Sequence, residues 1–418
     1  MAVVLPFRGV RYDLTRAGAI DTLIAPPYDV VTREERDRLV AQNPCNIFTL
    51  ELPDYNGDEY ARAAGLFSAW LKDGVLEKED AFAIYPYDIE FSLRGRTFSR
   101  CGMVALIRIE DWESRIIRPH EKTFDRVIED RYRLLATAKA QFSQIFVIYR
   151  RIKGASSALA LGKAGSEPLF DVRDHAGNNH RLWRLTDKDA IRDIHDAFLD
   201  QPLYIADGHH RYTTALKYKR DMDAIFGIDP SRSSNYLMAY LVDAEDPGLV
   251  VLPTHRIVTL NAEGFARLNE LSRAFEIEKI GDGPGLCAGL EAALAKEPDI
   301  PGFGVALDNG RRAEIWRLKR GAEDLLPTKR LDVAVLEDIV LKTLPREAIA
   351  YSSDGEEAIK GLGQNQGLFF LRPTPVAKVL DIADQGFTMP HKSTFFYPKI
   401  LTGLVLNSVD EVCPVELL

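Results

Sequence analysis

Residues 203–217 read LYIADGHHRYTTALK, which joins a strand pattern to a helix pattern. The apolar run Leu203–Ala206 predicts a short buried strand, and the side chains from Tyr212 onward repeat at helical spacing. The intervening pair, Asp207 and Gly208, predicts a tight turn, with Asp207 as the N-cap of the helix. A strand that turns directly into a helix is typical of α/β and α+β proteins.

The rest of the chain alternates between the same two patterns. Amphipathic helices are predicted from 58 to 74, from 261 to 276 and from 332 to 344. Further strands are predicted at Phe82–Tyr85, Met103–Ile109, Ile145–Tyr149, Tyr236–Val242 and Leu249–Leu252. The expected fold class is therefore α/β with mixed sheets, not a β-sandwich or a helical bundle.

Turn-forming residues separate two pairs of strands, which predicts two hairpins. The first joins Leu169–Arg173 to Arg181–Leu185, and the second joins Phe303–Leu307 to Ala313–Leu318. Both hairpins are expected at sheet edges. The segment from 154 to 165 is rich in glycine, alanine and serine and is expected to be a surface connection.

A chain of 418 residues leaves room for two or three domains. We expect an N-terminal α/β region over 1–150, a region that carries the Asp207 turn over 151–260, and a C-terminal α/β region over 261–418. The second boundary follows Val258, where a strand region punctuated by proline gives way to a helical one.

Composition narrows the class of protein. Hydrophobic residues make up 46% of the chain and charged residues 28%, which is typical of a soluble globular protein. The net charge of −9, from 53 Lys and Arg against 62 Asp and Glu, argues against a nucleic-acid partner. We expect a cytoplasmic protein, because no apolar run approaches the roughly 18 residues that span a bilayer and no secretory pattern opens the chain. The four cysteines are isolated, which predicts neither a disulfide framework nor a CxxC zinc site.

The turn after residue 206 places basic groups at the positive end of a helix. His209, His210 and Arg211 would add to the partial positive charge of the helix N-terminus. A bound anion would resolve this conflict, since backbone N–H groups, the close approach permitted by Gly208 and a guanidinium together suit a phosphate group. The structural alternative is that Asp207 caps the helix, the histidines are neutral and Arg211 pairs with a carboxylate.

A second polar cluster runs from Arg118 to Thr123, just before a predicted helix. Glu121 is a candidate general base or Mg²⁺ ligand, and His120 is a candidate proton carrier because imidazole titrates near neutral pH. Arg118 is a candidate phosphate ligand. The alternative is a solvated, salt-bridged helix start.

A third candidate is Lys392, in the segment MPHKSTFFYPK at 389–399. Its ammonium could neutralise a phosphate group, but no GxxxxGK run precedes it, so the segment is not a P-loop. Arg8 and Asp29 stand in proline-rich loops near the N-terminus, which could rim a pocket or simply connect elements.

Taken together, these segments resemble a family of unknown function numbered 1015, whose members are often labelled ParB-like. The matching residues are Pro6-Phe7-Arg8-Gly9, Ala25-Pro26-Pro27-Tyr28-Asp29-Val30, Arg118-Pro119-His120-Glu121 with Thr123, Asp207-Gly208-His209-His210-Arg211-Tyr212, Leu252-Pro253-Thr254-His255-Arg256, and Lys392-Ser393-Thr394 with Phe396-Tyr397-Pro398-Lys399. The Asp-Gly-His-His-Arg turn is also similar to the phosphate-contacting turn of the ParB and sulfiredoxin superfamily, which includes CTP-hydrolysing partition proteins, sulfiredoxins and free-serine kinases. That similarity implies a ParB/sulfiredoxin-like core that binds a nucleotide (ATP, ADP or CTP) with Mg²⁺. In the kinases a glutamate is the base for the serine hydroxyl, and Glu121 is the candidate here.

The leading hypothesis is a phosphotransferase that acts on a small hydroxylated metabolite or an amino acid such as serine. His209, His210 and Arg211 would stabilise phosphate charge, while Asp207 and Glu121 would hold Mg²⁺ or accept the hydroxyl proton. Lys392 would close the site, with Arg8, Arg118, His120 and Gly208 as further nucleotide contacts. The rival hypotheses are a ParB-like regulatory protein that binds or hydrolyses nucleotide without a phosphorylated product, and a scaffold whose polar motifs are structural.

Overall fold

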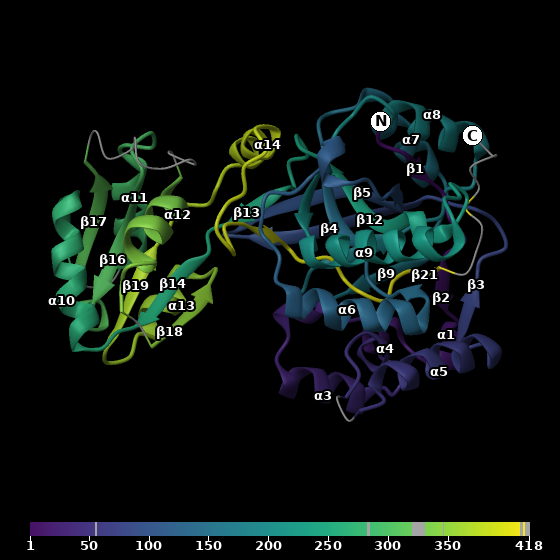
Figure 1. Cartoon of the computed structure of the whole chain (residues 1–418), viewed down its shortest axis with the longest axis horizontal. Helices are drawn as coiled ribbons and strands as arrows, with labels where there is room; N and C mark the ends of the chain where they lie inside the picture. The colour runs from purple at the N-terminus through teal and green to yellow at the C-terminus, as the bar shows by residue number, and fades with distance from the viewer. Residues whose placement is uncertain (55–56, 282–284, 320–330, 346, 410–412, 414–418) are drawn as a thin grey trace. The chain divides into compact units, whose positions relative to one another are not determined.

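A computed structural model describes residues 1–54, 57–281, 285–319, 331–345, 347–409 and 413. The chain divides into two compact units, which are considered separately (Figure 1). Unit 1 comprises Met1–Pro119, Thr123–Val250 and Pro398–Leu418, and unit 2 comprises His120–Lys122 and Val251–Tyr397. Both units combine strands with helices, which confirms the predicted α/β class.

These units do not coincide with the three predicted regions. Residues 1–150 and most of 151–260 contribute to unit 1, and the chain passes into unit 2 after Val250. Val258, where a boundary was expected, lies inside strand β14 (His255–Thr259). As functional regions, the three segments remain a prediction.

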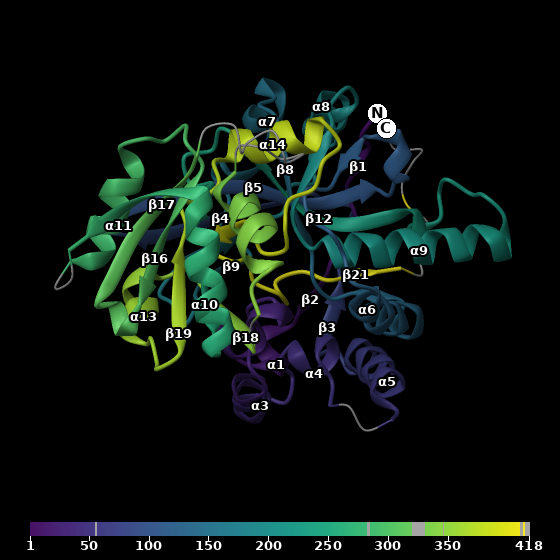
Figure 2. The same ribbon diagram turned by 60° about the vertical axis from the view of Figure 1, so that its left-hand side comes forward.

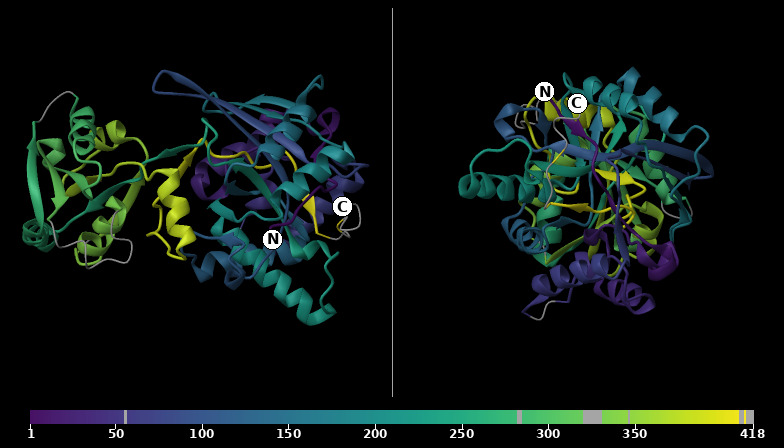
Figure 3. Two further views of the ribbon diagram at one scale, coloured as in Figure 1. Left: turned by 90° about the horizontal axis from the view of Figure 1, so that it is seen from above. Right: turned by 90° about the vertical axis from the view of Figure 1, so that its right-hand side faces the viewer.

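Unit 1 is built on a nine-stranded mixed sheet. Its strand order is β6 (Ile117–Arg118), β11 (Leu203–Asp207), β8 (Ile145–Tyr149), β12 (Tyr236–Asp243), β5 (Arg96–Arg108), β4 (Tyr85–Leu93), β10 (Asn179–Leu182) and β9 (Phe170–Arg173), with β1 (Val4–Leu5) paired to β5. Strands β8 and β12 are parallel, whereas β4 and β5 form a long antiparallel hairpin (Figure 3). The β9–β10 hairpin lies at the sheet edge, as predicted. Every residue of β8 is buried, as expected for a strand with an unbroken apolar sequence.

Helices pack in pairs beside this sheet. Helices α6 (Asp125–Ala138) and α9 (His209–Phe226) lie side by side, and α7 (Lys153–Lys163) packs against α8 (Lys188–Phe198). Helix α7 occupies the segment that was predicted to be a surface connection. Its alanine and leucine residues are strong helix formers, and Ala158 and Leu159 join the core, which together outweigh the glycines.

The N-terminal part of unit 1 forms a helical layer with its own core. Its elements are β2 (Val10–Tyr12), α1 (Leu14–Ala17), α2 (Ile20–Leu23), α3 (Arg33–Gln42), α4 (Phe48–Glu51), α5 (Glu59–Lys72) and β3 (Leu76–Lys78). Helix α5 confirms the predicted amphipathic helix. Residues 398–409, which we call the C-terminal segment, return to this layer: Thr402 and Leu406 bridge to Ala25 and Val10, and β21 (Asn407–Ser408) pairs with β7 (Ala140–Gln141).

Unit 2 is built on an antiparallel sheet. Its strand order is β15 (Phe275–Ile280), β17 (Arg312–Leu318), β16 (Gly302–Leu307), β19 (Gln366–Phe370), β14 and β18 (Ala348–Ser352). Helices α10 (Ala262–Leu271) and α11 (Leu286–Ala295) belong to separate apolar clusters on the two faces of the sheet (Figure 2). Two shorter helices, α13 (Gly355–Lys360) and α14 (Val376–Asp384), complete the second half of the unit.

Two expectations for unit 2 need correction. The β16–β17 hairpin forms as predicted, but β19 and β15 pair with its outer sides, so it does not lie at a sheet edge. The helix expected from 332 to 344 is a short α12 (Asp332–Val335) that continues as a π-helical turn over Leu336–Leu341. In both units, the described helices include none that is apolar over a length sufficient to cross a bilayer.

The packing of β5 against β12 can be tested at Gly102. A Cβ atom there would lie 2.5 Å from the buried ring of Tyr240 and 2.6 Å from the backbone oxygen of Leu241. We expect Gly102→Ala to destabilise unit 1 by about 1–3 kcal/mol because the core cannot expand. The control is Gly65→Ala in α5, where a Cβ would meet open space and the free energy of unfolding should rise by up to about 1 kcal/mol. Urea unfolding of both variants gives the comparison, and equal midpoints would contradict the packing described here.

Candidate functional site

The predicted strand, turn and helix are all present at residues 203–226, with one difference at the turn. Strand β11 ends at Asp207, and Gly208, with φ of 92°, is the N-cap residue of α9. Asp207 does not cap the helix, because the left-handed backbone at Gly208 starts the helix one residue later than predicted. A Cβ atom at residue 208 would lie 2.7 Å from Ile145, so the turn requires glycine for its space as well as for its backbone angle.

The carboxylate of Asp207 is shared by two cations. Lys399 Nζ donates to Oδ1 at 2.5 Å, and Arg211 Nη2 donates to Oδ2 at 3.0 Å. Burial alone would raise the pKa of Asp207, but the charges of Lys399 and Arg211 outweigh it and lower the pKa to about 2. The carboxylate is therefore ionised at neutral pH, and two positive charges surround one negative charge.

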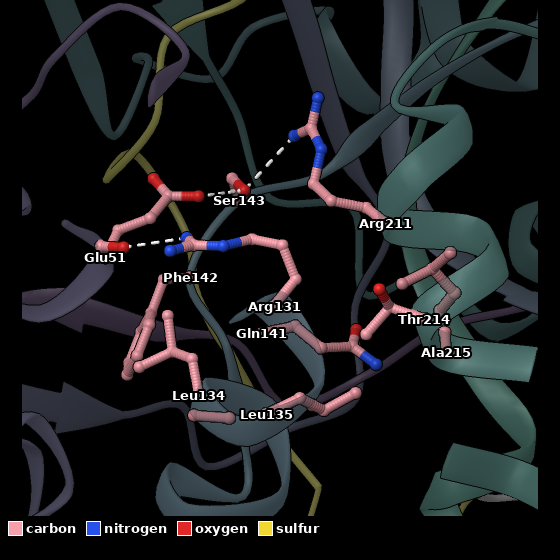
Figure 4. A pocket seen from close by; sticks show the side chains of 12 residues that line it. Glu51, Arg131, Leu134, Leu135, Gln141, Phe142, Ser143, Arg211, Thr214 and Ala215 are labelled. Atoms are coloured by element: carbon pink, nitrogen blue, oxygen red, sulfur yellow. Dashed lines mark hydrogen bonds between the residues drawn. The ribbon is translucent and has the colours of Figure 1, made fainter. Parts of the chain in front are cut away.

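Arg211 links this turn to a second buried acid. Its Nη1 donates to the Ser143 hydroxyl at 3.1 Å and to the backbone oxygen of Gln144 at 2.6 Å. The Ser143 hydroxyl in turn donates to Oε1 of Glu51, a residue that is only 3% exposed (Figure 4). Burial raises the pKa of Glu51, and the hydrogen bond from Ser143 and the charge of Arg211 oppose that rise. The chain of contacts from Lys399 through Asp207, Arg211 and Ser143 to Glu51 is the candidate site of unit 1.

Three residues in this series of contacts were absent from the predicted site. Lys399 was noted only as part of the family resemblance, and Glu51 and Ser143 were not singled out. A signal for Glu51 is present in the sequence, since it is the one acid in the mainly apolar segment Phe48–Leu52. A carboxylate buried in such a segment costs free energy unless it is paired or hydrogen-bonded. Ser143 and Lys399 carry no comparable local signal.

The two histidines of the turn differ in their surroundings. His209 is buried, and its charge contributes to the lowered pKa of Asp207. His210 stacks on Phe124, and its Nε2 accepts the backbone N–H of that residue at 3.0 Å. An Nε2 that accepts a hydrogen bond carries no proton, which fits the alternative of a neutral His210 better than a phosphate-binding imidazolium.

Two other predicted residues of unit 1, Arg118 and Arg8, hydrogen-bond to neighbouring residues. Arg118 donates to the Tyr204 hydroxyl at 3.3 Å from strand β6, and Arg8 donates to the backbone oxygen of Glu79 at 2.8 Å. Their roles as nucleotide contacts stay predictions.

The second and third sequence clusters meet in unit 2. The carboxylate of Glu121 and Nδ1 of His391 are 2.5 Å apart, and His120 Nε2 lies 3.1 Å from the Thr394 hydroxyl. A backbone bridge between Glu121 and Met389 joins the two segments. Residues 120–121 and 389–394 thus form one polar cluster, although more than half of the chain separates them. The sequence pattern of either segment alone did not predict this cluster.

Lys392 belongs to the same cluster of unit 2. Its backbone is left-handed, with φ of 54°, and its ammonium lies 5.4 Å from the centre of the Tyr351 ring. The buried guanidinium of Arg256 donates to the backbone oxygens of His391 and Lys392 at 3.1 Å and fixes this loop. The lysine that reaches the Asp207 turn is therefore Lys399, and Lys392 remains a prediction for a role of its own.

Asp207 does not fit the predicted role of a Mg²⁺ ligand. Both of its oxygens are held in ion pairs, and the described part of the chain contains no group of three or more His, Cys, Asp or Glu side chains placed to bind one metal ion. Glu121, the second predicted ligand, is hydrogen-bonded to His391. No chemical step is therefore assigned to a metal held by these residues.

The ion pair between Lys399 and Asp207 predicts a pH-dependent contribution to stability. Because the folded pKa of Asp207 lies below its ordinary value of 3.8, the pair stabilises the protein above about pH 4 and loses this effect as the pH falls toward 2. We expect Lys399→Met to lower the free energy of unfolding by about 1–2 kcal/mol at pH 7 and by less at pH 3. Urea titrations at both pH values measure this, with Lys188→Met, at an exposed position in α8, as the control. A penalty that is the same at both pH values would show that Asp207 is not the partner.

Comparisons with known proteins place the fold in context. No curated protein matches the chain. Among solved structures, a free serine kinase mutant in complex with ADP is similar at 13% identity and a TM-score of 0.38, covering 75% of this chain and 94% of that chain. A conserved hypothetical protein from Pyrococcus furiosus is 13% identical with a TM-score of 0.35, covering 71% and 92%. SbnI from Staphylococcus aureus, with a C-terminal truncation, is 11% identical with a TM-score of 0.37, covering 72% and 85%.

At these identities and TM-scores the likeness assigns neither a ligand nor a reaction to this chain. The predicted relation to the ParB and sulfiredoxin superfamily stays a prediction. The sequence profile of a family described as "Protein of unknown function (DUF1015)" matches residues 4–334, which is well over half of the chain. The chain therefore belongs to the DUF1015 family.

Proposed function

We propose that this protein is a nucleotide-dependent phosphotransferase whose Gly208 turn binds the phosphate groups of the nucleotide. The observation that carries the proposal is the pair of cations at the start of α9, where Lys399 and Arg211 flank the carboxylate of Asp207. The helix N-terminus adds a further partial positive charge. A phosphate group supplies the negative charge and the acceptor oxygens that suit such a site.

Each residue of the turn has a separate task in this proposal. The backbone N–H groups that follow Gly208 bind phosphate oxygens, while Lys399 and Arg211 offset the charge that spreads over the oxygens during transfer. Asp207 positions the two cations. With a pKa of about 2 it is too weak a base to take a proton from a hydroxyl group at neutral pH, so the base in this proposal is another residue.

The acceptor in this proposal is a small hydroxylated metabolite, with serine as the first example to test. Glu121 is the proposed base for the acceptor hydroxyl, as the family resemblance implies. The Nδ1 atom of His391, 2.5 Å from the carboxylate of Glu121, holds that carboxylate in place. ADP and AMP, which the solved free serine kinases hold, are the first nucleotides to test, followed by ATP and CTP.

Nucleotide binding should depend on Arg211. We expect Arg211→Ala to weaken the affinity for ADP by about tenfold or more, because a charge-assisted hydrogen bond is lost, and Arg211→Lys to cause a smaller loss because the charge remains. The matched control is Arg220→Ala, at a position on the same helix that is 57% exposed, which should leave the affinity unchanged. Isothermal titration calorimetry on variants shown to be folded by circular dichroism measures these constants. The proposal fails if the wild-type protein binds none of ADP, ATP and CTP, or if Arg211→Ala binds them as tightly as wild type.

Phosphate transfer should depend on Glu121 separately from binding. We expect Glu121→Gln to slow the formation of phosphorylated product by roughly a hundredfold, as removal of a general base does, with nucleotide affinity changed by less than about twofold. Phosphorus NMR of reactions with serine and a panel of other hydroxy acids follows both product and free phosphate. Glu356→Gln, at a 55% exposed position in unit 2, is the control. Release of free phosphate with no phosphorylated acceptor would contradict the transferase and favour a nucleotide-hydrolysing regulatory protein.

A further inference from the structure

A cavity of about 60 Å³ lies within unit 1 beside Arg211 (Figure 4). One end is polar and is formed by Glu51, Arg131, Ser143 and Arg211. The other end is largely apolar, and its lining includes Leu134, Leu135, Phe142, Ala215 and Leu237. Gln141 and Thr214 also line this end, and both hydrogen-bond to backbone oxygens of the protein. The division into two ends means that a solute with one polar group and a short hydrocarbon body would match the lining, whereas a uniformly charged one would not.

The polar end holds a hydrogen-bond acceptor that the protein does not satisfy. Oε1 of Glu51 accepts from the Ser143 hydroxyl, but Oε2 has no hydrogen-bond partner among the residues that the structure describes. Glu51 is 3% exposed, so bulk water does not compensate for the missing bond. Buried polar atoms are almost always paired, and an unpaired carboxylate oxygen is among the most costly. An occupant of the cavity that donates to Oε2 removes this cost.

The neighbouring guanidinium groups already donate elsewhere. Arg131 donates to Asp130 and to the backbone oxygen of Glu51 at 2.8 Å. Arg211 donates to Asp207, to Ser143 and to a backbone oxygen, and its Nε has no acceptor among the described residues. Neither guanidinium group bonds to Oε2 of Glu51 in this arrangement, so a molecule inside the cavity can supply the donor.

Size limits what that molecule is. One water-sized group needs about 10–15 Å³ of cavity volume. A cavity of about 60 Å³ therefore holds on the order of four or five heavy atoms. This room suits a hydroxyl or amino group on a chain of about three carbon atoms.

We propose that this cavity is a binding site for a small molecule that presents one O–H or N–H donor on a short alkyl body. The donor bonds to Oε2 of Glu51, and the alkyl body packs against Leu134, Phe142 and Ala215. The site needs no nucleotide, so it goes beyond the proposed function. Arg211 belongs to both sites, because it lines the cavity beside Ser143 and also donates to Asp207 at the Gly208 turn.

The probes are 1-propanol and propylammonium, which have the same number of heavy atoms and differ in charge. In ligand-observed NMR with the full chain and no nucleotide, we expect saturable binding of at least one probe, with Kd in roughly the millimolar range for so few atoms. Glu51→Gln should weaken propylammonium by about tenfold or more and 1-propanol by less, since the amide oxygen still accepts a hydrogen bond but carries no charge. The charge of the natural ligand is read from which probe binds more tightly.

Two kinds of variant separate this site from adventitious binding. Ala215→Val adds methyl groups to the cavity and should weaken both probes by about tenfold or more, while Glu245→Gln, at a position that is 61% exposed, should change neither. Ala140→Val fills the cavity from β7 and replaces Ala215→Val if circular dichroism shows that variant to be unfolded. The proposal is overturned if neither probe saturates, which would leave water as the occupant, or if the filled variants or Glu51→Gln bind propylammonium and 1-propanol as wild type does. A wild type that binds these probes without binding any nucleotide would reject the phosphotransferase and leave this site intact.

Discussion

The carboxylate of Asp207, held between Lys399 and Arg211, is the interaction on which the candidate site depends. A buried ion pair gains little net free energy, because the desolvation of each charge offsets the attraction between them. Here two cations flank one carboxylate at the start of a helix whose N-terminus already carries partial positive charge. Such a combination is easier to explain by a need for an anionic ligand than by stability. Arg211 also donates to the Ser143 hydroxyl, which donates to Glu51. The same guanidinium group therefore contributes to the electrostatics of the turn and of the cavity beside it.

The sequence predicts the local elements of the site because each element is determined by the pattern of a few consecutive residues. An apolar run, an Asp-Gly pair and a helical repeat are enough to locate β11 and α9 within a residue or two. The capping residue was wrong because Asp and Gly can both stand at the N-cap, and only the backbone angle at Gly208 decides between them. The buried strand β8 was predicted from its unbroken apolar sequence, whereas α7 was missed because glycine and serine concealed a helical pattern that tertiary packing stabilises.

Partners that are distant in sequence could not be predicted in the same way. Lys399 reaches Asp207 across 192 positions, and no local pattern distinguishes it from Lys392, which carries a more suggestive set of hydroxyl neighbours. The pairing of Glu121 with His391 spans 270 positions, and no role was predicted for His391 from the sequence. Such pairings depend on the order of strands in a sheet and on where a returning segment crosses it. A single sequence contains that information only through the whole fold.

The route of the C-terminal segment has a consequence for how the protein is made. Strand pairs with Ala25, Val10 and β7 tie residues 402–408 into the N-terminal layer, and the buried Arg100 donates to the backbone oxygen of Pro398 at 2.8 Å. On the ribosome, unit 2 is synthesised before this segment emerges. Unit 1 therefore lacks strand β21 until unit 2 has been synthesised. The nascent chain therefore acquires Lys399, and with it the complete turn, only after the whole of unit 2 has been synthesised. Until then, the residues of unit 1 that pack against the buried Leu401, Leu404 and Leu406 of this segment are uncovered, and exposed apolar surface of this kind favours aggregation during synthesis.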